Sequence, residues 1–420
     1  MQVAPPPSAQ PHETPESRYD GSAARPVTVW VARGFGTAAH ALTTLRGSLG
    51  DDLPLGRLLA SHPRRDSPVL TAADEAFLEP DLVGDDWVDW AVEVCRREQV
   101  DLLWVTHEAE AAAAARRAFA AVGTTLLVPP VDALRASRAK SEVYLVAERH
   151  GLATPPWERV TGVDEARAAV DRLSRHSPHG VCVKPDTGQG AVGVHRLVDD
   201  WDDLPVGVDL PTERWLGHLA RHPERAWLVL PWMPGDEHSV DALLDPAGAL
   251  VAAAVRTKAD SSRLQHAWHD RDLVDSSAAL LSALSVTPLG NAQWREHEGE
   301  RVLLEVNPRP SGGLYRSSAA LGVDLLAAAV RQLLTGHSGI ASGTRVTGVV
   351  TTTSLQVAVA SPAIGQLAER GEDVLRGART GSAGHGYPVV PDQLQLAVGR
   401  AHRGVGGLEQ VAVEQAVTGG

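Results

Sequence analysis

The stretch of sequence whose residue types are best suited to chemistry is 303–313, which reads LLEVNPRPSGG. Glu305 and Asn307 are two apart on an expected strand, so both side chains point to one face. A carboxylate beside an amide oxygen offers hard ligands of the kind that Mg²⁺ prefers. Across an expected hairpin, Gln293 adds a third oxygen ligand near the level of Glu305. Proline and glycine at this density are unusual at an ordinary strand end, so we interpret the string as functional.

A second stretch, residues 184–194, reads KPDTGQGAVGV. Lys184 ends an expected strand, and the glycines after it expose backbone N–H groups that can fold over phosphates. The stretch is not a P-loop, because no Gly-Lys-Ser/Thr closes it. A glycine-rich turn between two strands, without any ligand, stays open as an alternative.

A third stretch, residues 234–241, reads PGDEHSVD. On a strand, Glu237, Ser239 and Asp241 share one face, and Glu237 is placed to accept hydrogen bonds from ribose hydroxyls. The preceding residues 230–233 are apolar and offer walls and backbone groups to a base. The alternative is a solvated acidic strand face.

The distribution of lysine supports these assignments. Only three of the 39 basic residues are lysines, namely Lys140, Lys184 and Lys258. Lysine is a compact point charge on a thin stem, unlike arginine. In a chain that uses arginine for its ordinary basic surface, a retained lysine indicates a specific need, although a random remnant of an arginine-rich composition is the alternative.

Composition excludes several classes of function. The formal charge of −13 on 420 residues argues against nucleic acid as the main partner and against a polybasic membrane anchor. Two distant cysteines form neither a disulfide framework nor a zinc site and fit a reducing compartment. No stretch is apolar enough to span a bilayer. Residues 1–26 predict a disordered tail, and we expect a cytoplasmic protein.

The elements that must position these residues follow two different sequence patterns. Residues 27–128 alternate strands and helices, which predicts a parallel α/β domain, while residues from 181 onward are rich in hairpins and predict an antiparallel α+β region. The expected strands are 27–31, 101–106, 125–128, 181–184, 192–197, 227–230, 238–244, 249–256, the hairpin 290–306, and 349–360. The expected helices begin after residue 36 and span 86–98, 108–121, 137–150, 273–284 and 321–335.

The order of these motifs resembles the ATP-grasp superfamily, in particular its carbamoyl-phosphate-synthetase and biotin-carboxylase-like branch. The resemblance covers roughly residues 27–335 and rests on Lys140, the Lys184 glycine loop, Gly235-x-Glu237, Gln293 and Glu305-x-Asn307-Pro-Arg309. It implies a pre-ATP-grasp domain at 27–128 and an ATP-grasp domain at 129–338, with a small lobe at about 155–235 and a large lobe at about 236–338. Residues 339–420 form an extension of uncertain fold.

The resemblance also implies a role for each matching residue. The phosphates and base of ATP would be bound by Lys140, Lys184, Gly188, Gly190, Gly193, Leu230 and Met233, and the ribose by Glu237. One or two Mg²⁺ or Mn²⁺ ions would be held by Gln293, Glu305 and Asn307. The catalytic residues would be Lys184 and Arg309, with Arg256 and Lys258 near the γ-phosphate and the acceptor.

Two departures from the family pattern matter. This chain has Leu230-Pro-Trp where many relatives have Gln-Glu before an aromatic residue, so a side-chain contact to adenine is lost. Gln293 stands where many relatives have a carboxylate, which weakens the case for a second metal ion.

The expected function is ATP-dependent ligation, in which a carboxylate is activated as an acyl phosphate and passed to a nucleophile, most often an amine. A carboxylate kinase and a non-catalytic nucleotide-binding regulator remain alternatives. The expected partners are a small carboxylate and an amine, and a homodimer is left open. We expect the acceptor pocket at residues 33–36 and 106–108, where α/β sheets bind ligands, and lids at the glycine loop and at 260–272.

Overall fold

The two central strands of the first sheet, Val27–Ala32 and Leu102–Val105, are buried along their whole length, as expected for a parallel sheet covered on both faces. In the computed structural model it is all parallel with the order β3-β2-β1-β4-β5. Its strands are β1 (Val27–Ala32), β2 (Leu55–His62), β3 (Glu75–Leu78), β4 (Leu102–Val105) and β5 (Thr125–Leu127). The strand order reverses between β1 and β4, so the loops that follow these two strands meet at the place where such sheets bind ligands.

The helices of this part of the chain are short and amphipathic. They are α1 (Ala38–Ser48), the 3₁₀ helix η1 (Pro68–Ala72), α2 (Gly84–Glu98), α3 (Ala109–Ala114), α4 (Arg116–Ala121) and α5 (Val131–Ala136). The helix expected over 108–121 is therefore broken at Ala115. The helix expected over 137–150 begins three residues late, as α6 (Lys140–Arg149), because Ala139 is extended and bridges Thr187.

The second sheet has the order β6-β10-β7-β8-β9. It consists of β6 (Glu158–Val160), β7 (Val181–Pro185), β8 (His195–Val198), β9 (Asp209–Pro211) and β10 (Trp227–Pro231). Helices α7 (Val163–Ser174) and α8 (Thr212–Arg221) accompany it, and buried Trp215 on α8 packs near Trp227, 6.0 Å between ring centroids.

The third sheet has the order β15-β14-β11-β12-β13-β17, with β16 paired to β12. Its strands are β11 (Glu237–Leu244), β12 (Leu250–Lys258), β13 (Leu264–Trp268), β14 (Leu289–His297), β15 (Glu300–Asn307), β16 (Thr344–Arg345) and β17 (Val350–Thr353). Helix α9 (Arg271–Ala283) covers one face, where Trp294 donates to Ser277 at 2.9 Å. The last two strands show that the third sheet continues beyond residue 338.

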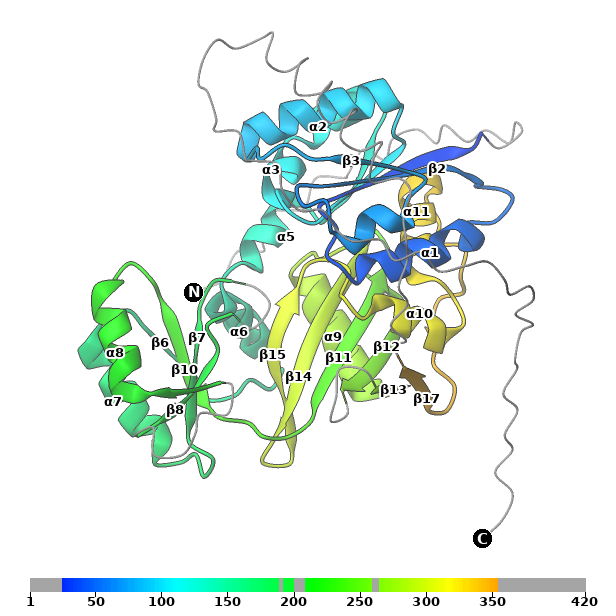
Figure 1. Ribbon diagram of the computed structural model, residues 1–420. Coiled ribbons are helices and arrows are strands. Elements are labelled where there is room, and N and C mark those ends of the chain that lie inside the picture. The colour runs from blue at the N-terminus through cyan, green and yellow to red at the C-terminus, as the bar shows by residue number, and fades with distance from the viewer. Residues whose placement is uncertain (1–24, 189–191, 200–207, 259–263, 354–420) are drawn as a thin grey trace, which may run out of the picture. The chain divides into compact units, whose positions relative to one another are not determined.

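Two further helices join the third sheet to the first part of the chain. These are α10 (Leu314–Leu321), which the sequence did not predict, and α11 (Leu325–Thr335). Helix α1 packs against both (Figure 1), and Thr44 donates to Asp324 at 2.7 Å. No single helix among the described residues is long and apolar enough to cross a membrane; α10 and α11 pass that test only as a pair, bent by 92°.

The structure describes residues 25–188, 192–199, 208–258 and 264–353, all of which belong to one compact unit, Met1–Ala378. The disordered tail expected at 1–26 lies outside this part of the chain except for its last two residues. Most of the 339–420 extension, most of the strand expected at 349–360 and the first residues of the 260–272 lid also lie outside it.

Candidate active site

The candidate site is built on one face of the third sheet, where three neighbouring strands carry polar residues in register. The strands pair Glu237 with Arg295, Ser239 with Gln293 and Asp241 with Asn291, so these six side chains share a face, as alternation on strands requires. On the next strand, Gln293 pairs with Glu305 and Asn291 with Asn307. The expectation that Glu305, Asn307 and Gln293 come together is met by this register.

The oxygen-bearing side chains at the edge of this face are close enough to share a ligand. The amide nitrogen of Asn307 lies 3.1 Å from Glu305 Oε1, and Gln293 Nε2 lies 3.2 Å from Asn291 Oδ1. Turning the Asn307 and Gln293 amides exchanges these nitrogens for oxygens, which would give one carboxylate and two amide oxygens. That donor set suits Mg²⁺. It is weakly charged, and the described residues contain no group of three His, Cys, Asp or Glu placed to hold a metal.

Arg309 follows this cluster and reaches back toward the first sheet. Its guanidinium lies over the Phe35 ring, 5.2 Å from the centroid, and Nη1 donates to Pro310 O at 3.2 Å. Burial lowers the pKa of Arg309, and Glu305 opposes that shift. Within the described part of the chain, Arg309 has no ion-pair partner, so its charge is available to an anion.

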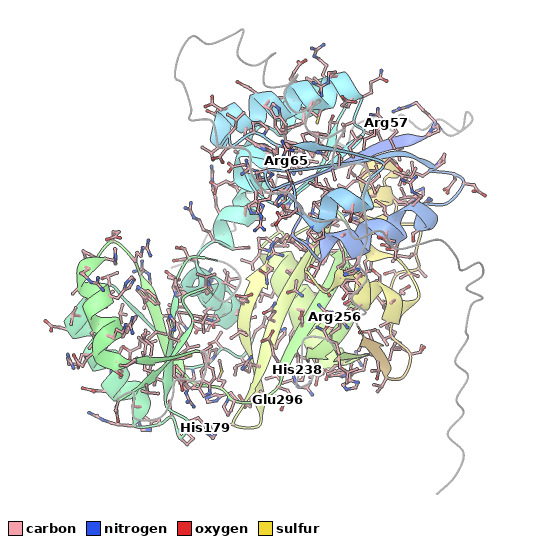
Figure 2. The ribbon with its side chains drawn as sticks, viewed as in Figure 1. Arg57, Arg65, His179, His238, Arg256 and Glu296 are labelled. Atoms are coloured by element: carbon pink, nitrogen blue, oxygen red, sulfur yellow. The ribbon has the colours of Figure 1, made fainter. Side chains whose placement is uncertain are left out.

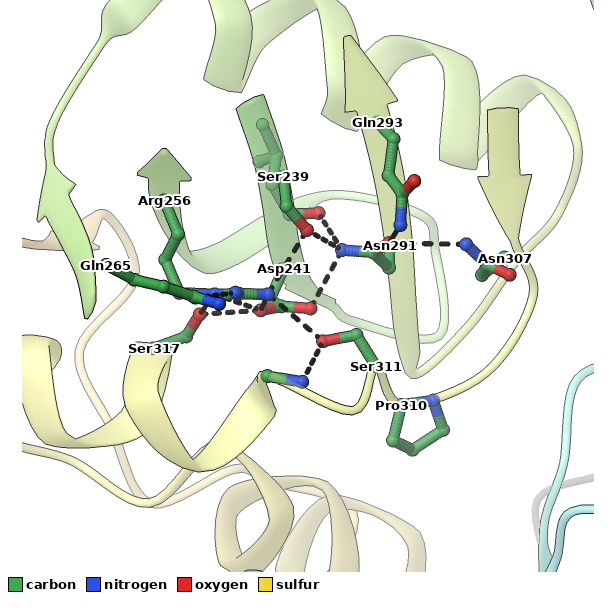
Figure 3. A network of polar contacts seen from close by, with 12 residues as sticks. Ser239, Asp241, Arg256, Gln265, Asn291, Gln293, Asn307, Pro310, Ser311 and Ser317 are labelled. Atoms are coloured by element: carbon green, nitrogen blue, oxygen red, sulfur yellow. Dashed lines mark hydrogen bonds and ion pairs between the residues drawn. The ribbon is translucent and has the colours of Figure 1, made fainter. Parts of the chain in front are cut away.

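Arg256, expected near the γ-phosphate, pairs with Ser239 in the register of β11 and β12 and lies on the same face of the sheet, within a closed network of polar contacts (Figure 3). Its side chain is 2% exposed and pairs with Asp241 Oδ2, 2.7 Å from Nη2. The remaining guanidinium N–H groups donate to the hydroxyls of Ser239, Ser311 and Ser317 and to the Gln265 amide oxygen. These contacts connect the strands to the 309–313 loop and leave the expected role of Arg256 near the γ-phosphate a prediction.

The glycine at position 313 is explained by this network. A Cβ at Gly313 would lie 2.2 Å from Arg256 Nη1 and 2.4 Å from Cζ, a distance that no real contact shows. The Gly313 N–H donates to Ser311 Oγ at 3.1 Å. The segment 311–313 therefore packs directly against the Arg256 guanidinium, and the Gly313 N–H is used in a hydrogen bond within the loop.

Lys184 is buried at the junction of three elements. Its Nζ donates to the Tyr144 hydroxyl at 2.8 Å and to the Leu304 carbonyl at 2.9 Å, and the Tyr144 hydroxyl donates to the same carbonyl at 3.1 Å. Burial lowers the pKa of Lys184 to about 8, with Lys140 and Arg295 acting in the same direction. The contact joins β7 of the second sheet to β15 of the third, next to Glu305.

Lys140 is the first residue of helix α6 and lies beside the glycine loop. Its Nζ donates to the carbonyls of Pro185 and Gly188, at 3.2 and 3.1 Å. Buried Asp186 fixes this arrangement, because its carboxylate accepts from the N–H and the hydroxyl of Ser141, both at 2.9 Å. Both lysines are thus held by α6, Lys140 directly and Lys184 through Tyr144 one turn later, a link that no sequence pattern revealed.

The other predicted contacts are only partly described. Gly188 and Gly193 have left-handed φ values of 135° and 78°, and a Cβ at Gly193 would meet Pro185 at 2.8 Å. Gly190 lies outside the described residues, and for Lys258 the structure gives only the backbone, at the end of β12.

The expected base and ribose contacts meet at the connection between β10 and β11. Leu230 and Met233 are buried, and Glu237 accepts from Arg295 Nη2 at 2.8 Å. Arg295 was not predicted, because arginine is common in this sequence. Its position two residues after Gln293, on the same face of the strand, could have identified it. His238, on the opposite face, contacts Glu296 and belongs to a different environment (Figure 2).

A cavity of about 530 Å³ joins the metal-ligand cluster to the first sheet. One side is polar and includes Lys140, Glu305 and Arg309, and the other is formed by the ends of β4 and β5 with α5. Its lining includes residues 106–108, as expected for the acceptor pocket, but does not include residues 33–36. Arg33 instead turns away to buried Glu79, with Nε 2.5 Å from Oε1. Arg33 and Glu108 both have left-handed backbone conformations, with φ of 48° and 52°, which cost energy in residues other than glycine.

Comparison with known proteins agrees with this architecture. Residues 223–357 match a family model described as ATP-grasp in the biosynthetic pathway with Ter operon. The carbamoyl phosphate synthase large chain of Gemmatimonas aurantiaca is 24% identical over 291 residues, which are 66% of this chain but only 25% of that protein. The chain therefore spans about a quarter of the length of this curated relative.

Solved structures share the fold at low sequence identity. Biotin carboxylase from Campylobacter jejuni aligns with a TM-score of 0.57 and 13% identity, covering 77% of this chain and 74% of that one. The L-amino acid ligase from Bacillus licheniformis aligns with a TM-score of 0.55 and 15% identity, covering 80% and 81%. The family match over residues 223–357, the curated relatives and the shared fold make the chain similar to ATP-grasp proteins, in particular to the carbamoyl-phosphate-synthetase and biotin-carboxylase-like branch.

Proposed function

We propose that this protein is an ATP-dependent ligase that converts a carboxylate to an acyl phosphate and transfers the acyl group to an amine. The observation that carries the proposal is the single cavity in which Lys140, Gly188, Glu305, Asn307 and Arg309 face one space. Phosphate-binding, metal-binding and acceptor functions need to converge on one volume for phosphoryl transfer between bound substrates.

The chain's own residues account for the phosphate end of the site. Gln293, Glu305 and Asn307 would hold Mg²⁺, which when bound neutralises phosphate charge and orients the transferred group. Lys140 and the Gly188 loop would bind the phosphates from one side. Arg309, which is partly buried and has no ion-pair partner within residues that the structure describes, would stabilise the charge on the equatorial oxygens of the transferred phosphoryl group.

The first step is attack of a carboxylate oxygen on the γ-phosphorus of ATP. The new P–O bond forms as the bond to the bridging oxygen of the β-phosphate breaks, and ADP leaves. In the second step an amine nitrogen attacks the acyl carbon, inorganic phosphate leaves, and the nitrogen loses a proton. His107 lies in the cavity wall and is exposed, so it is available to accept that proton.

The acid binds, in this proposal, against the wall formed by the carboxyl ends of β4 and β5. That wall is largely apolar, with Val105, Leu127, Val128 and Leu134, while the reacting end faces Arg309 and Glu305. The volume of about 530 Å³ is suited to a compact acid together with the terminal phosphates. The fold does not determine which acid and which amine bind; that specificity depends on the residues that line the pocket.

The test is Mg²⁺-dependent ADP release measured against a panel of carboxylic acids, with and without amines, with Glu305→Ala as the blank. Release stimulated by one acid, and further by one amine, would support the ligase. Release with an acid alone, and accumulation of an acyl phosphate trapped by hydroxylamine, would favour a carboxylate kinase. ATP binding without release under any acid would favour a regulatory protein, and no ATP binding would overturn the proposal.

A further inference from the structure

One carboxylate in the wall of the cavity has no role in the proposed function and no counter-ion. Glu108 follows β4, lines the cavity of about 530 Å³ and is partly buried. Among the residues that the structure describes, no lysine, arginine or histidine forms an ion pair with it. Glu110, in the same wall, pairs with Arg135 at 2.8 Å between Oε1 and Nε. A partly buried charge without a partner costs free energy, and a cation bound in the cavity would relieve that cost.

The usual structural role of an acidic residue at the start of a helix is not the one that Glu108 fills. It is the N-cap residue of α3, but its side chain makes no capping hydrogen bond to that helix. Oε2 instead accepts from the N–H of Gly84, the first residue of α2, at 2.9 Å. This bond fixes the carboxylate through one oxygen and leaves Oε1 without a hydrogen-bond partner within the described residues.

The backbone of Glu108 is also in an unfavourable conformation. Its φ of 52° lies in the left-handed region, which glycine adopts without the steric cost that a Cβ brings. On conformational grounds alone, glycine would suit this turn after β4 better than glutamate. Binding of a ligand by the carboxylate would explain why a glutamate stands here, since strained residues of this kind occur where a ligand is held.

The surroundings of Glu108 suit an ammonium ion with an apolar body. The neighbouring lining includes Val105, Leu127 and Val128, which can cover alkyl groups but offer a cation no competing charge. Arg138 also lines the cavity, where it lies 3.9 Å from Glu110. Alkyl amines are protonated at neutral pH, because their pKa is close to the value of about 10.4 for lysine. An amine substrate therefore reaches the cavity as a cation.

We propose that Glu108 is a specificity-determining residue that binds the amine substrate in its ammonium form. The inference rests on the proposed function and names the class of the nucleophile, a primary amine that enters as a cation, in place of an alcohol or a thiol. Oε1 accepts an N–H of the ammonium group while the Gly84 N–H holds Oε2. The bound ion releases one proton to water before its nitrogen attacks the acyl carbon.

The experiment measures the binding of n-butylammonium, and of the uncharged n-butanol of similar shape, to the full chain without nucleotide, by titration with saturation-transfer NMR. Glu108→Gln removes the charge and keeps an oxygen for the Gly84 N–H. Glu110→Gln is the matched control, because Glu110 lines the same cavity and already has Arg135 as its partner. Melting temperatures show whether the variants are folded. If Glu108→Gln is not, Glu108→Gly removes the carboxylate at a backbone conformation that glycine prefers.

We expect saturable binding of n-butylammonium that Glu108→Gln weakens by about tenfold and Glu110→Gln changes by less than about twofold, as for the loss of one hydrogen bond to a charged group. n-Butanol should bind the unaltered protein more weakly than n-butylammonium does, and its binding should not respond to either substitution. Equal affinity of Glu108→Gln for n-butylammonium, or no saturable binding by the unaltered protein, would overturn the inference and leave Glu108 as a residue that only holds the start of α2. ADP release with the acid panel is measured separately and decides the proposed function, so the failure of one is distinguishable from the failure of the other.

Discussion

The guanidinium of Arg309 lies over the ring of Phe35, with 5.2 Å between Cζ and the ring centroid. Phe35 belongs to the turn after β1, and its ring meets Trp104 of β4 edge-on at 6.2 Å. Arg309, just after β15 of the third sheet, is therefore oriented by the switch point of the first sheet. The glycine turn that the sequence suggested as part of the acceptor pocket contributes here by positioning Arg309.

Replacing Phe35 by leucine should slow turnover more than it weakens nucleotide binding. A cation–π contact contributes about 0.5–2 kcal/mol, and its loss would let the Arg309 guanidinium rotate away from the transferred phosphoryl group. We expect kcat to fall by about three- to thirtyfold while the Kd for ATP stays within twofold. Phe35→Tyr, which keeps the ring, is the control. A Phe35→Leu enzyme with unchanged kcat would show that the contact has no catalytic role.

The lowered pKa of Lys184 leads us to expect a specific pH dependence of nucleotide binding. Burial depresses its pKa to about 8, so in the free protein the ammonium form is present below about pH 8 and is lost above it. If Lys184 binds phosphate, as the resemblance implies, binding requires the charged form and is linked to proton uptake. We expect the Kd for Mg-ATP to rise as pH increases from 7.5 to 9.5, by up to about tenfold per pH unit. Lys184→Met should bind weakly and lack this dependence.

The same depressed pKa predicts that Lys184 destabilises the folded protein. With a pKa of about 8 when folded and 10.5 when unfolded, the unfolded state binds more protons between these values, so stability rises with pH there. The burial cost is present in full below pH 8. Lys184→Met, in which Tyr144 can still donate to the Leu304 carbonyl, should raise stability at pH 7 by up to about 3 kcal/mol. Denaturant unfolding at pH 7 and 10.5 checks this, since the gain should shrink at the higher pH.

Gly313→Ala should disrupt the site through Arg256. The new Cβ would lie within 2.5 Å of three guanidinium atoms, and Arg256 cannot move away because Asp241 and Ser317 hold it. Overpacking of this kind costs about 1–3 kcal/mol, and the shifted loop should also reduce kcat at least tenfold. Gly47→Ala is the matched control, because a Cβ there meets nothing within 4 Å inside helix α1, and it should be neutral or slightly stabilising. Equal melting temperatures for the two variants would contradict the packing argument.

How much of this could be predicted from sequence depended on whether the signal was local. The pairing of Glu305 with Gln293 was predicted from the alternation of side chains on a hairpin. The first strand and helix α2 were predicted from the pattern of apolar residues in the sequence. The strands β2 (Leu55–His62) and β3 (Glu75–Leu78) were missed because both are only partly buried and mix polar with apolar residues, so neither shows the continuous apolar run that marked β1. The contacts of Arg256 could not be predicted, because its partners Asp241, Ser311 and Ser317 come from three separate segments and only the fold brings them together.

The metal cluster leads to the last prediction, in which Gln293→Glu should tighten divalent metal binding. Gln293 faces Glu305 in the register of β14 and β15, so the substitution places two carboxylates side by side. Without metal these charges repel, and the pKa of one should rise; a divalent ion relieves the repulsion. We expect the Mg²⁺ concentration for half-maximal ADP release to fall several-fold, and the melting temperature to fall without Mg²⁺ and recover with it. Gln99→Glu, an exposed substitution at the C-terminal end of α2 and away from the cluster, should not change the Mg²⁺ requirement. An unchanged Mg²⁺ requirement in Gln293→Glu would remove Gln293 from the metal site.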